Sequence, residues 1–294
     1  MTDYADVDGT IWFDGRMVPW RDANVHFLTH GLHYASTVFE GVRAYDGNVF
    51  KLREHTDRLF ESAEIVGFRI PHSRDVIDDA CRAVLKANRI TDGYIRPAAW
   101  RGSDKLGLSP GGATIHVAIA AWEWPSYFSS EVRANGIRLT HAKWRRPAPD
   151  TAPTRAKASG LYQICTLAKQ TAEDQGFDDA LMLDYRGFVA EATGANIFLV
   201  IDGGLHTPIA DCFLDGITRQ TVIQLAKVAG IDVIERHILP EEIAGAQEVF
   251  LTGTAAEITP VGSIGSATFT PGPVCTLLID RYHALTRKTA TVQR

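Results

Sequence analysis

A lysine among small residues is the feature of this sequence most suited to covalent chemistry. Lys157 lies in the segment 154–162 (TRAKASGLY), directly after the turn-rich run 147–153. Lysines on solvated helix faces usually have long neighbours, whereas small neighbours leave space around the amine. Space and partial burial are what a Schiff-base lysine needs, because burial lowers the pKa of the amine and makes it nucleophilic. Taken alone, the segment also fits an exposed loop lysine before a helix.

Three short segments further along the chain are suited to holding an anion with backbone amides. Residues 215–219 (DGITR) open an expected helix, whose N-terminus carries unpaired N–H groups and partial positive charge, and Thr218 adds a hydroxyl. Residues 252–256 (TGTAA) form a tight turn of small residues, and residues 192–196 (ATGAN) follow Glu191. Each alone is more often a turn than a site. Together with the lysine they supply the amine, carboxylate and phosphate donors that pyridoxal phosphate requires.

Composition narrows the class of protein. The chain has 294 residues, of which 45% are hydrophobic and 22% charged, which is typical of one large or two moderate globular domains. The net charge of −5 gives no long-range attraction to nucleic acid or membranes, and the basic run 143–146 is expected to be solvated. The acidic start is not a secretory signal. Scattered cysteines without metal-type spacing indicate buried thiols in a cytoplasmic protein: Cys81, Cys165, Cys212 and Cys275.

Turns and apolar periodicity predict an α+β protein. Asp14-Gly15 lies inside an expected hairpin, 10–20, and Ser73 is expected to cap a helix. Further helices are expected at 53–66, after Lys157 to about residue 174, and at 218–229 and 274–286. Strands are expected at 38–45, 93–100, 113–122, 133–141, 179–183, 188–191, 196–201, 232–235, 248–251 and 257–264. We expect an N-terminal α+β domain (1–122), a connector (123–134) and a C-terminal cofactor-binding domain (135–294).

Motifs spread from about residue 10 to residue 265 resemble one family in their order. The chain resembles the branched-chain amino acid aminotransferases, which belong to the D-amino-acid-transaminase-like pyridoxal-phosphate enzymes of fold type IV. The resemblance implies a two-domain fold with a small N-terminal α/β domain and a larger C-terminal domain with a β-barrel-like core. Besides the Lys157 segment, the matching stretches are 30–43 (HGLHYASTVFEGVR), 53–59 (REHTDRL), 94–97 (YIRP), 191–198 (EATGANIF), 216–219 (GITR) and 253–260 (GTAAEITP).

The resemblance implies a role in cofactor binding for several residues. Lys157 would form the Schiff base with pyridoxal 5'-phosphate and then move the proton. Glu191 would pair with the protonated pyridine nitrogen, and Tyr162 would hydrogen-bond the phenolic oxygen. Asn196 would belong to the same cofactor-binding set. The cofactor phosphate would be bound by Arg58, Ile217, Thr218 and Thr254.

The resemblance also implies a substrate site and a homodimer. The N–H groups of Thr254 and Ala255 would hold the substrate carboxylate, with Tyr94 and Arg96 in support. The side-chain pocket would be lined by Phe39, Trp124 and Tyr127, and by Tyr34 and Leu108 of the neighbouring subunit. No metal site is expected. His30 and His33 are weak candidates for a metal or base role, and we expect them to pack around the turn at Tyr34.

The implied reaction is ping-pong transfer of the amino group of leucine, isoleucine or valine to 2-oxoglutarate, in the cytoplasm. The chain departs from the family at 98–110, where Arg101 and Lys105 add cations and Leu108 replaces a smaller residue. The alternatives are an (R)-selective amine or D-amino-acid transaminase, an aminodeoxychorismate lyase, or a small-molecule binding protein. The strand 94–96 (YIR) favours the branched-chain type, and Lys157 with a carboxylate argues against a binding protein.

Overall fold

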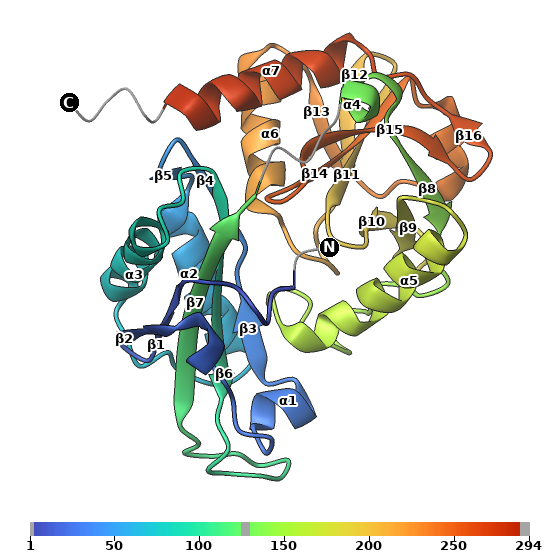
Figure 1. Ribbon diagram of the computed structural model, residues 1–294. Coiled ribbons are helices and arrows are strands. Elements are labelled where there is room, and N and C mark those ends of the chain that lie inside the picture. The colour runs from blue at the N-terminus through green and yellow to red at the C-terminus, as the bar shows by residue number, and fades with distance from the viewer. Residues whose placement is uncertain (1–2, 125–129, 289–294) are drawn as a thin grey trace. The chain divides into compact units, whose positions relative to one another are not determined.

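The structure is a computed structural model, and it describes residues 3–124 and 130–288. The described residues divide into two compact units (Figure 1), one of residues 3–124 with 156–160 and one of residues 130–155 with 161–288. The segment with Lys157 therefore groups with the first unit. The domain boundaries expected from the sequence, 1–122, 123–134 and 135–294, stay a prediction. Within the described residues, no helix is long and apolar enough to span a membrane.

The first unit is built on an antiparallel sheet of seven strands in the order β2-β1-β7-β6-β4-β5, with β3 also paired to β6. Its longest ladder runs between β6 and β7, from Gly93 opposite Glu123 to Arg101 opposite Ile115. The expected Asp14-Gly15 hairpin is present between β1 and β2. The strands are β1 (Thr10–Phe13), β2 (Arg16–Pro19), β3 (Thr37–Phe39), β4 (Val42–Tyr45), β5 (Asn48–Val49), β6 (Gly93–Arg101) and β7 (Ile115–Glu123).

Two long helices cover one face of this sheet and bury the first hydrophobic core (Figure 1). The helices of this unit are η1 (Trp20–Asp22), α1 (His30–Tyr34), α2 (Leu52–Ile65) and α3 (Arg74–Ala87). The expected cap of α3 is confirmed, since Ser73 Oγ accepts the N–H of Val76 at 3.3 Å. The core side chains come from α2, α3 and the inner face of the sheet, and they include Ala156 and Ala158.

The single strand expected at 38–45 is wrong, because the chain forms β3 and β4 with a break at Glu40-Gly41. The N–H of Glu40 still donates to the C=O of Pro97 on β6, at 2.8 Å. Proline has no N–H with which to return that bond, so the ladder is interrupted at this position. The break places Glu40 inside the protein, where its side chain is completely buried.

The second unit contains a closed barrel of six strands, which confirms the expected barrel-like core. The sheet order is β10-β9-β8-β15-β14-β11-β12-β13, with β16 on β15, and β10 pairs a second time with β11. That closing pair is Glu191 opposite Asn196. The strands are β8 (Ile137–His141), β9 (Asp179–Leu183), β10 (Val189–Ala192), β11 (Asn196–Ile201), β12 (Gly204–Pro208), β13 (Val233–Arg236), β14 (Glu248–Gly253), β15 (Glu257–Ile264) and β16 (Ala267–Thr268).

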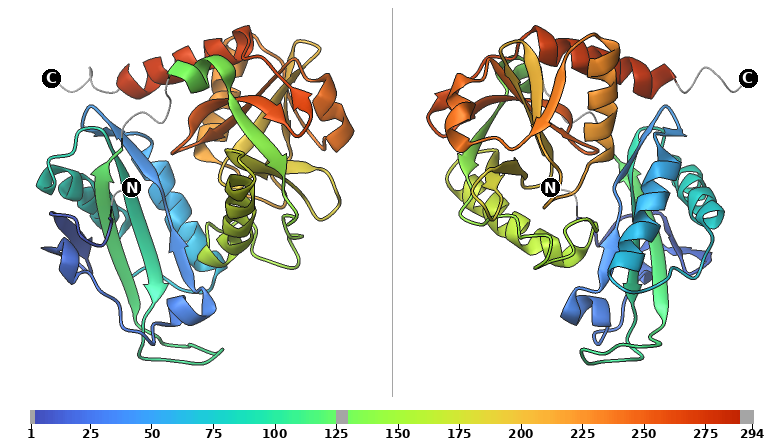
Figure 2. Two further views of the ribbon diagram at one scale, coloured as in Figure 1. Left: turned by 45° about the vertical axis from the view of Figure 1, so that its right-hand side comes forward. Right: turned by 180° about the vertical axis from the view of Figure 1, so that it is seen from behind.

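Helices pack against the barrel, and Figure 2 shows α6 and α7 next to each other along it. They are α4 (Ser130–Asn135), η2 (Ser159–Tyr162), α5 (Gln163–Asp174), α6 (Ile217–Val228), η3 (Pro240–Gly245) and α7 (Pro273–Lys288). The strand expected from 133 is wrong in its first part. Helix α4 occupies that part, and the strand begins after Gly136, whose φ of 71° is a left-handed value that favours glycine at a helix end.

The helix expected after Lys157 is present, with η2 beginning at Ser159 and α5 running from Gln163 to Asp174. Lys157 itself precedes the helix, because the backbone around it is bonded to the first unit's sheet. Ala158 forms an antiparallel bridge with Val38, and the N–H of Phe39 donates to the C=O of Lys157 at 3.1 Å. A C=O committed to a strand cannot accept the bond that a helix requires, so Lys157 lies in extended chain.

Candidate functional site

Lys157 is held by its backbone, and its side chain is half-buried. Its N–H donates to Ser62 Oγ on α2 at 2.9 Å, while its C=O accepts from Phe39. The adjacent Ala156 and Ala158 are buried in the core. Their small size therefore serves packing, a different reason from the open space that we expected around the amine. These contacts use backbone atoms only, so they hold residue 157 in place whatever its side chain is.

The first unit brings several of the predicted substrate residues together around one aromatic ring. Lys157 Nζ and Arg96 Cζ each lie 4.9 Å from the ring centroid of Phe39. Arg96 also lies 5.4 Å from the ring of Tyr94, and the rings of Tyr94 and Trp124 are 5.4 Å apart. Cations beside aromatic faces are stabilised by the ring quadrupole. This group can offer a ligand an apolar wall and a positive charge at the same time.

Gly41 is a determinant of this group that the sequence analysis missed. A Cβ at this position would lie 1.6 Å from the hydroxyl oxygen of Tyr94, so a larger residue would displace the tyrosine. The Tyr94 side chain is buried and its hydroxyl lies 3.5 Å from Arg96 Nη2. A glycine inside an apolar strand pattern is a signal for close approach, and it could have identified this position.

Arg58, predicted to bind phosphate, forms a two-pronged ion pair with Glu40. Nε and Nη2 of Arg58 lie 2.7 and 2.8 Å from the two carboxylate oxygens. His55 Nδ1 donates to the same carboxylate at 2.7 Å. Burial opposes the ionisation of Glu40, but the charge of Arg58 and the His55 hydrogen bond outweigh it and hold the Glu40 pKa well below its usual range. Burial in turn lowers the pKa of His55.

Glu40 and His55 were also missed by the sequence analysis. A carboxylate between strand residues 38–39 and 42–45 stands out against the apolar pattern, because charged residues are almost never fully buried unless they are paired. That signal indicates a buried ion pair without naming the partner. Arg58 and His55 lie three positions apart on α2, on one face of the helix, so both reach the same carboxylate.

In the second unit, Glu191 is buried where the barrel closes and has a cation beside it. Arg146 Nε lies 3.2 Å from one carboxylate oxygen, and Asn196 Nδ2 donates to the other at 3.2 Å. Arg146 also donates from Nη1 to Leu161 O and Cys165 Sγ, both at 3.3 Å. Burial works to lower the pKa of Arg146, but Glu191 outweighs it and raises that pKa. The arrangement favours an ionised carboxylate.

Arg146 corrects one expectation from the sequence. The basic run 143–146 was expected to be solvated, yet the Arg146 side chain is only 6% exposed. The partner that offsets this burial, Glu191, lies on a distant strand, so the run itself carries no sign of it. Arg145 and Lys143 in the same run are exposed.

The three segments suited to an anion lie close together in the second unit. Helix α6 begins after Gly216, and no side chain caps its N-terminus. A Cβ on Gly216 would lie 2.3 Å from Asn196 Oδ1, so the start of α6 lies directly against residues 192–196. The turn after β14 adjoins the same segment, because Asn196 pairs with Thr252. Within the described residues, Thr252 Oγ1 is buried without a hydrogen-bond partner.

This set of donors fits a phosphorylated cofactor with a basic ring nitrogen. An uncapped helix start provides N–H groups and partial positive charge, and the glycine before it leaves room for the Asn196 side chain. Ile217 and Thr218 on its first turn are buried, and Thr254 and Ala255 of the next turn are half-buried. The adjacent carboxylate of Glu191 can accept a hydrogen bond from a protonated ring. The buried Thr252 hydroxyl without a partner, the uncapped start of α6 and the nearby carboxylate together match the needs of such a cofactor.

The remaining predicted residues have varied surroundings. Tyr162 is half-buried at the start of α5. Tyr34 and Leu108 are exposed, by 44% and 87%. Tyr127 lies outside the described residues. His30 is buried, with Nε2 donating to Gly107 O at 2.9 Å and its ring 4.7 Å from that of Tyr34, which confirms the expected packing role.

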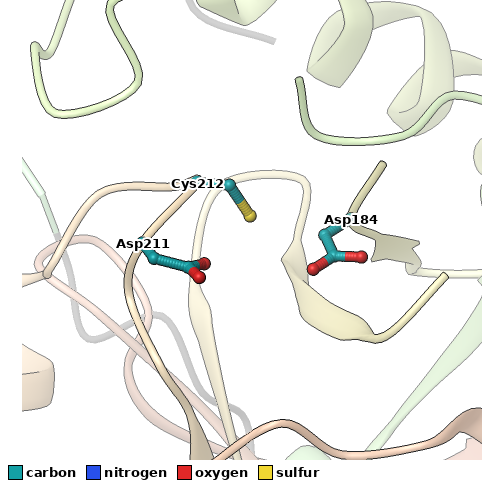
Figure 3. A group of neighbouring side chains, drawn as sticks. All are labelled: Asp184, Asp211 and Cys212. Carbon is teal, nitrogen blue, oxygen red and sulfur yellow. The ribbon is translucent and has the colours of Figure 1, made fainter. Parts of the chain in front are cut away.

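One further cluster has a metal-like composition but a structural explanation. Ligand atoms of Asp184, Asp211 and Cys212 lie within 4.8 Å of one another (Figure 3). Asp184 Oδ1 accepts the N–H groups of Arg186, Gly187 and Phe188, at 2.8 to 3.0 Å. The guanidinium of Arg186 bonds both aspartates. These contacts satisfy the carboxylates and stabilise the turn between β9 and β10.

Comparison with known proteins shows the family of this chain. Residues 37–264 match the amino-transferase class IV family. The chain is 46% identical over 264 residues to the branched-chain-amino-acid aminotransferase of Pseudomonas aeruginosa, covering 88% of this chain and 86% of that protein. The crystal structure of the Escherichia coli branched-chain amino acid aminotransferase superposes with a TM-score of 0.91, at 41% identity and 95% coverage of both chains.

A second solved structure is that of a cofactor-bound relative. The PLP-form (holo-form) of the branched-chain amino acid aminotransferase from Thermobaculum terrenum superposes with a TM-score of 0.88, at 33% identity, over 96% of this chain and 94% of that one. The family match covers most of the chain, and the similarity extends over nearly all of these relatives. The chain belongs to the class IV aminotransferase family, with the fold-type IV architecture of these structures.

Proposed function

We propose that the protein is a pyridoxal-phosphate-dependent branched-chain-amino-acid aminotransferase. It exchanges the amino group of leucine, isoleucine or valine with 2-oxoglutarate in two half-reactions at one site. The observation that carries the proposal is the amine of Lys157 beside the Phe39 ring, with the Arg96 guanidinium on the same ring. The names of relatives that cover most of the chain support the same activity and the branched-chain substrate class.

Different residues bind the ring nitrogen, the phenolic oxygen and the phosphate of the cofactor. When bound, pyridoxal 5'-phosphate supplies an aldehyde and an electron-withdrawing ring that stabilises negative charge on the substrate α-carbon. Glu191, kept ionised by Arg146, accepts the ring N–H, and Asn196 fixes that carboxylate. Tyr162 donates to the phenolic oxygen. The phosphate is held by Arg58, by Thr254, and by Ile217 and Thr218 on the first turn of α6.

The chemical work falls to Lys157 and the substrate residues. Lys157 Nζ is the amine that the cofactor aldehyde requires, and it then takes and returns the proton of the substrate α-carbon. The substrate carboxylate is bound by the N–H groups of Thr254 and Ala255. Tyr94 supports the bound carboxylate, and an apolar side chain packs on Phe39 and Trp124. Arg96 gives the same site a charge for the second carboxylate of 2-oxoglutarate.

We also infer a cytoplasmic homodimer. Apolar side chains are exposed around α1 and the loop before β7: Phe27 by 73%, Leu32 by 63%, Leu106 by 53% and Leu108 by 87%. His30 ties these two segments together through Gly107. Covering such a surface with a second copy removes it from water and brings Tyr34 and Leu108 to the partner's substrate site. The four cysteines are free and buried, which is usual in a reducing compartment.

An absorption titration tests the proposed function. Purified protein loaded with pyridoxal 5'-phosphate is mixed with L-leucine, and separately with (R)-1-phenylethylamine, without a keto acid. We expect the absorption band of the bound cofactor to disappear with L-leucine alone and to return when 2-oxoglutarate is added. Loss of the band with the amine would support the (R)-selective alternative, and pyruvate release from aminodeoxychorismate would support the lyase. Protein that takes up no cofactor would refute the proposal.

A further inference from the structure

The ion pair of Arg58 with Glu40 is unusually enclosed for a charge assigned to ligand binding. Glu40 is completely buried, and the Arg58 side chain is only 13% exposed. Glu40 receives three donors, two from Arg58 and one from His55, all within 2.8 Å. A buried ion pair is weak evidence for stability, because desolvation of both charges offsets their attraction. Stabilisation of the fold is therefore not a sufficient reason for the Arg58–Glu40 pair.

The two hydrogen bonds from Arg58 to Glu40 determine which N–H groups of the guanidinium remain directed elsewhere. Glu40 engages the edge formed by Nε and Nη2, and the Nη1 amino group lies outside this pair. A guanidinium gripped along one edge cannot rotate, so the direction of its other N–H groups is set. An arginine that is already fixed loses less side-chain freedom when it binds an anion.

The segment that carries Glu40 also holds the lysine. The N–H of Phe39 donates to the C=O of Lys157, and the N–H of the next residue, Glu40, donates to Pro97 O on β6. The Glu40 carboxylate then orients Arg58 on α2, whose Ser62 accepts the N–H of Lys157. One interrupted strand thus fixes the backbone of the lysine and the guanidinium of the arginine relative to each other.

We propose that Glu40 and His55 are positioning residues that hold the Arg58 guanidinium in the orientation in which it binds the phosphate of the cofactor. This inference rests on the proposed function. Glu40 grips one edge of the guanidinium, and His55 prevents the carboxylate from turning away by occupying one of its oxygens. Neither residue touches the phosphate itself.

Two roles of Glu40 predict opposite results. If Glu40 acted only as a counter-charge, its removal would leave the positive charge of Arg58 uncompensated and would strengthen phosphate binding. If Glu40 positions Arg58, its removal weakens phosphate binding despite the gain in positive charge. A residue needed only for the fold would weaken the binding of every ligand of the site equally. Comparing ligands with and without a phosphate therefore separates the three cases.

The experiment measures equilibrium binding of pyridoxal 5'-phosphate and of pyridoxal to the cofactor-free full-length protein. Glu40→Gln is expected to weaken binding of the phosphorylated ligand by about three- to tenfold, from the rotamer freedom regained by Arg58. Its affinity for pyridoxal should stay at the wild-type value. Glu54→Gln is the matched control, since Glu54 lies on the same helix but pairs with Lys51 at the surface; both affinities should stay unchanged.

His55→Gln provides a second variant should Glu40→Gln fail to fold. It leaves the Arg58–Glu40 pair present and removes the ring that fixes it, so a smaller loss with the same preference for the phosphorylated ligand is expected. Unchanged or tighter binding of pyridoxal 5'-phosphate in the variants, or equal losses for both ligands, would overturn the inference. Wild-type protein that binds neither ligand would instead refute the proposed function, so the two failures are distinguishable.

Discussion

The burial of a side chain and the groups that it contacts determine the role of an individual residue in this protein. Arg146 and Arg145 are adjacent and chemically identical, yet one is buried against Glu191 and the other is exposed. A carboxylate in a nearly dry environment keeps its charge only beside a cation or several hydrogen-bond donors. Glu191 has the cation of Arg146 and the Asn196 amide, and Glu40 has the cation of Arg58 and the His55 ring. Each unit thus contains a buried carboxylate that is paired with an arginine.

Replacing Lys157 should remove activity without removing the fold. The hydrogen bonds at this position use the backbone N–H and C=O, which alanine retains. We expect Lys157→Ala to lower the rate of the leucine half-reaction by about a thousandfold or more. Stopped-flow absorption measures the rate, and circular dichroism measures the fold. Lys169→Ala, at a half-buried position on α5, is the control. A rate close to wild type for Lys157→Ala would exclude the proposed mechanism.

Breaking the buried pair of Arg146 should destabilise the second unit. Arg146→Met keeps the length of the side chain but leaves Glu191 without its cation, and we expect the free energy of unfolding to fall by about 3 kcal/mol. Adding Glu191→Gln removes the stranded charge and should recover most of that loss. Urea denaturation of the single and double variants checks both statements. Equal stability of Arg146→Met and wild type would mean that the pair contributes nothing.

The burial of His55 predicts a pH dependence of stability. Its folded-state pKa is lowered from the ordinary value of 6.5, mainly by burial, so the unfolded chain binds a proton more readily. Stability therefore falls as the pH drops below 6.5, by at most about 1.4 kcal/mol for each pH unit. The difference in unfolding free energy between wild type and His55→Gln should change between about pH 7.5 and about pH 5.5. A constant difference would contradict this sign.

At the scale of elements, the site depends on places where regular structure is interrupted. Pro97 interrupts the pairing of β6 between the end of β3 and the start of β4. At this break Glu40 is buried and Gly41 lies against the Tyr94 hydroxyl. In the second unit, the barrel closes through Glu191 and Asn196, beside the uncapped start of α6. Strand breaks and helix ends expose the backbone groups and side chains that regular ladders would occupy.

A methyl group at Gly41 should disturb the element that holds Tyr94. The added Cβ would lie 1.6 Å from the Tyr94 hydroxyl, so Gly41→Ala should lower the unfolding free energy by about 1–3 kcal/mol. Adding Tyr94→Phe removes the nearest atom and should recover part of the loss. Thermal unfolding compares these variants with Gly111→Ala, where a Cβ meets nothing within 4 Å. Full tolerance of alanine at Gly41 would show that Tyr94 moves without cost.

At the scale of the molecule, exposed apolar surface predicts self-association. Leu108 is 87% exposed on a segment tied to α1 by His30. Leu108→Asp places a charge in the proposed interface between copies, so we expect the dimer to dissociate at protein concentrations where wild type remains dimeric. Sedimentation velocity measures the assembly. Val228→Asp, at a position that is 79% exposed at the end of α6, is the control; equal behaviour of both variants would place the interface elsewhere.

The sequence by itself determined the features that depend on neighbours in the chain. Asp14-Gly15 makes a hairpin and Ser73 caps a helix, because turn and cap geometry involve only a few adjacent residues. The unusual lysine at 157 and the small-residue anion segments were also visible locally. The order of these motifs was enough to identify the family. Their individual roles in binding cofactor and substrate stay predictions until the variants are measured.

Only the tertiary structure decided which distant groups become partners. Arg58 pairs with Glu40 and Arg146 with Glu191 across long stretches of chain, and no local pattern selects one carboxylate over another. Lys157 is held in place before the helix because its C=O accepts the N–H of Phe39, on a strand far earlier in the sequence. Burial makes such pairs necessary, because a charge removed from water costs free energy unless a partner compensates it.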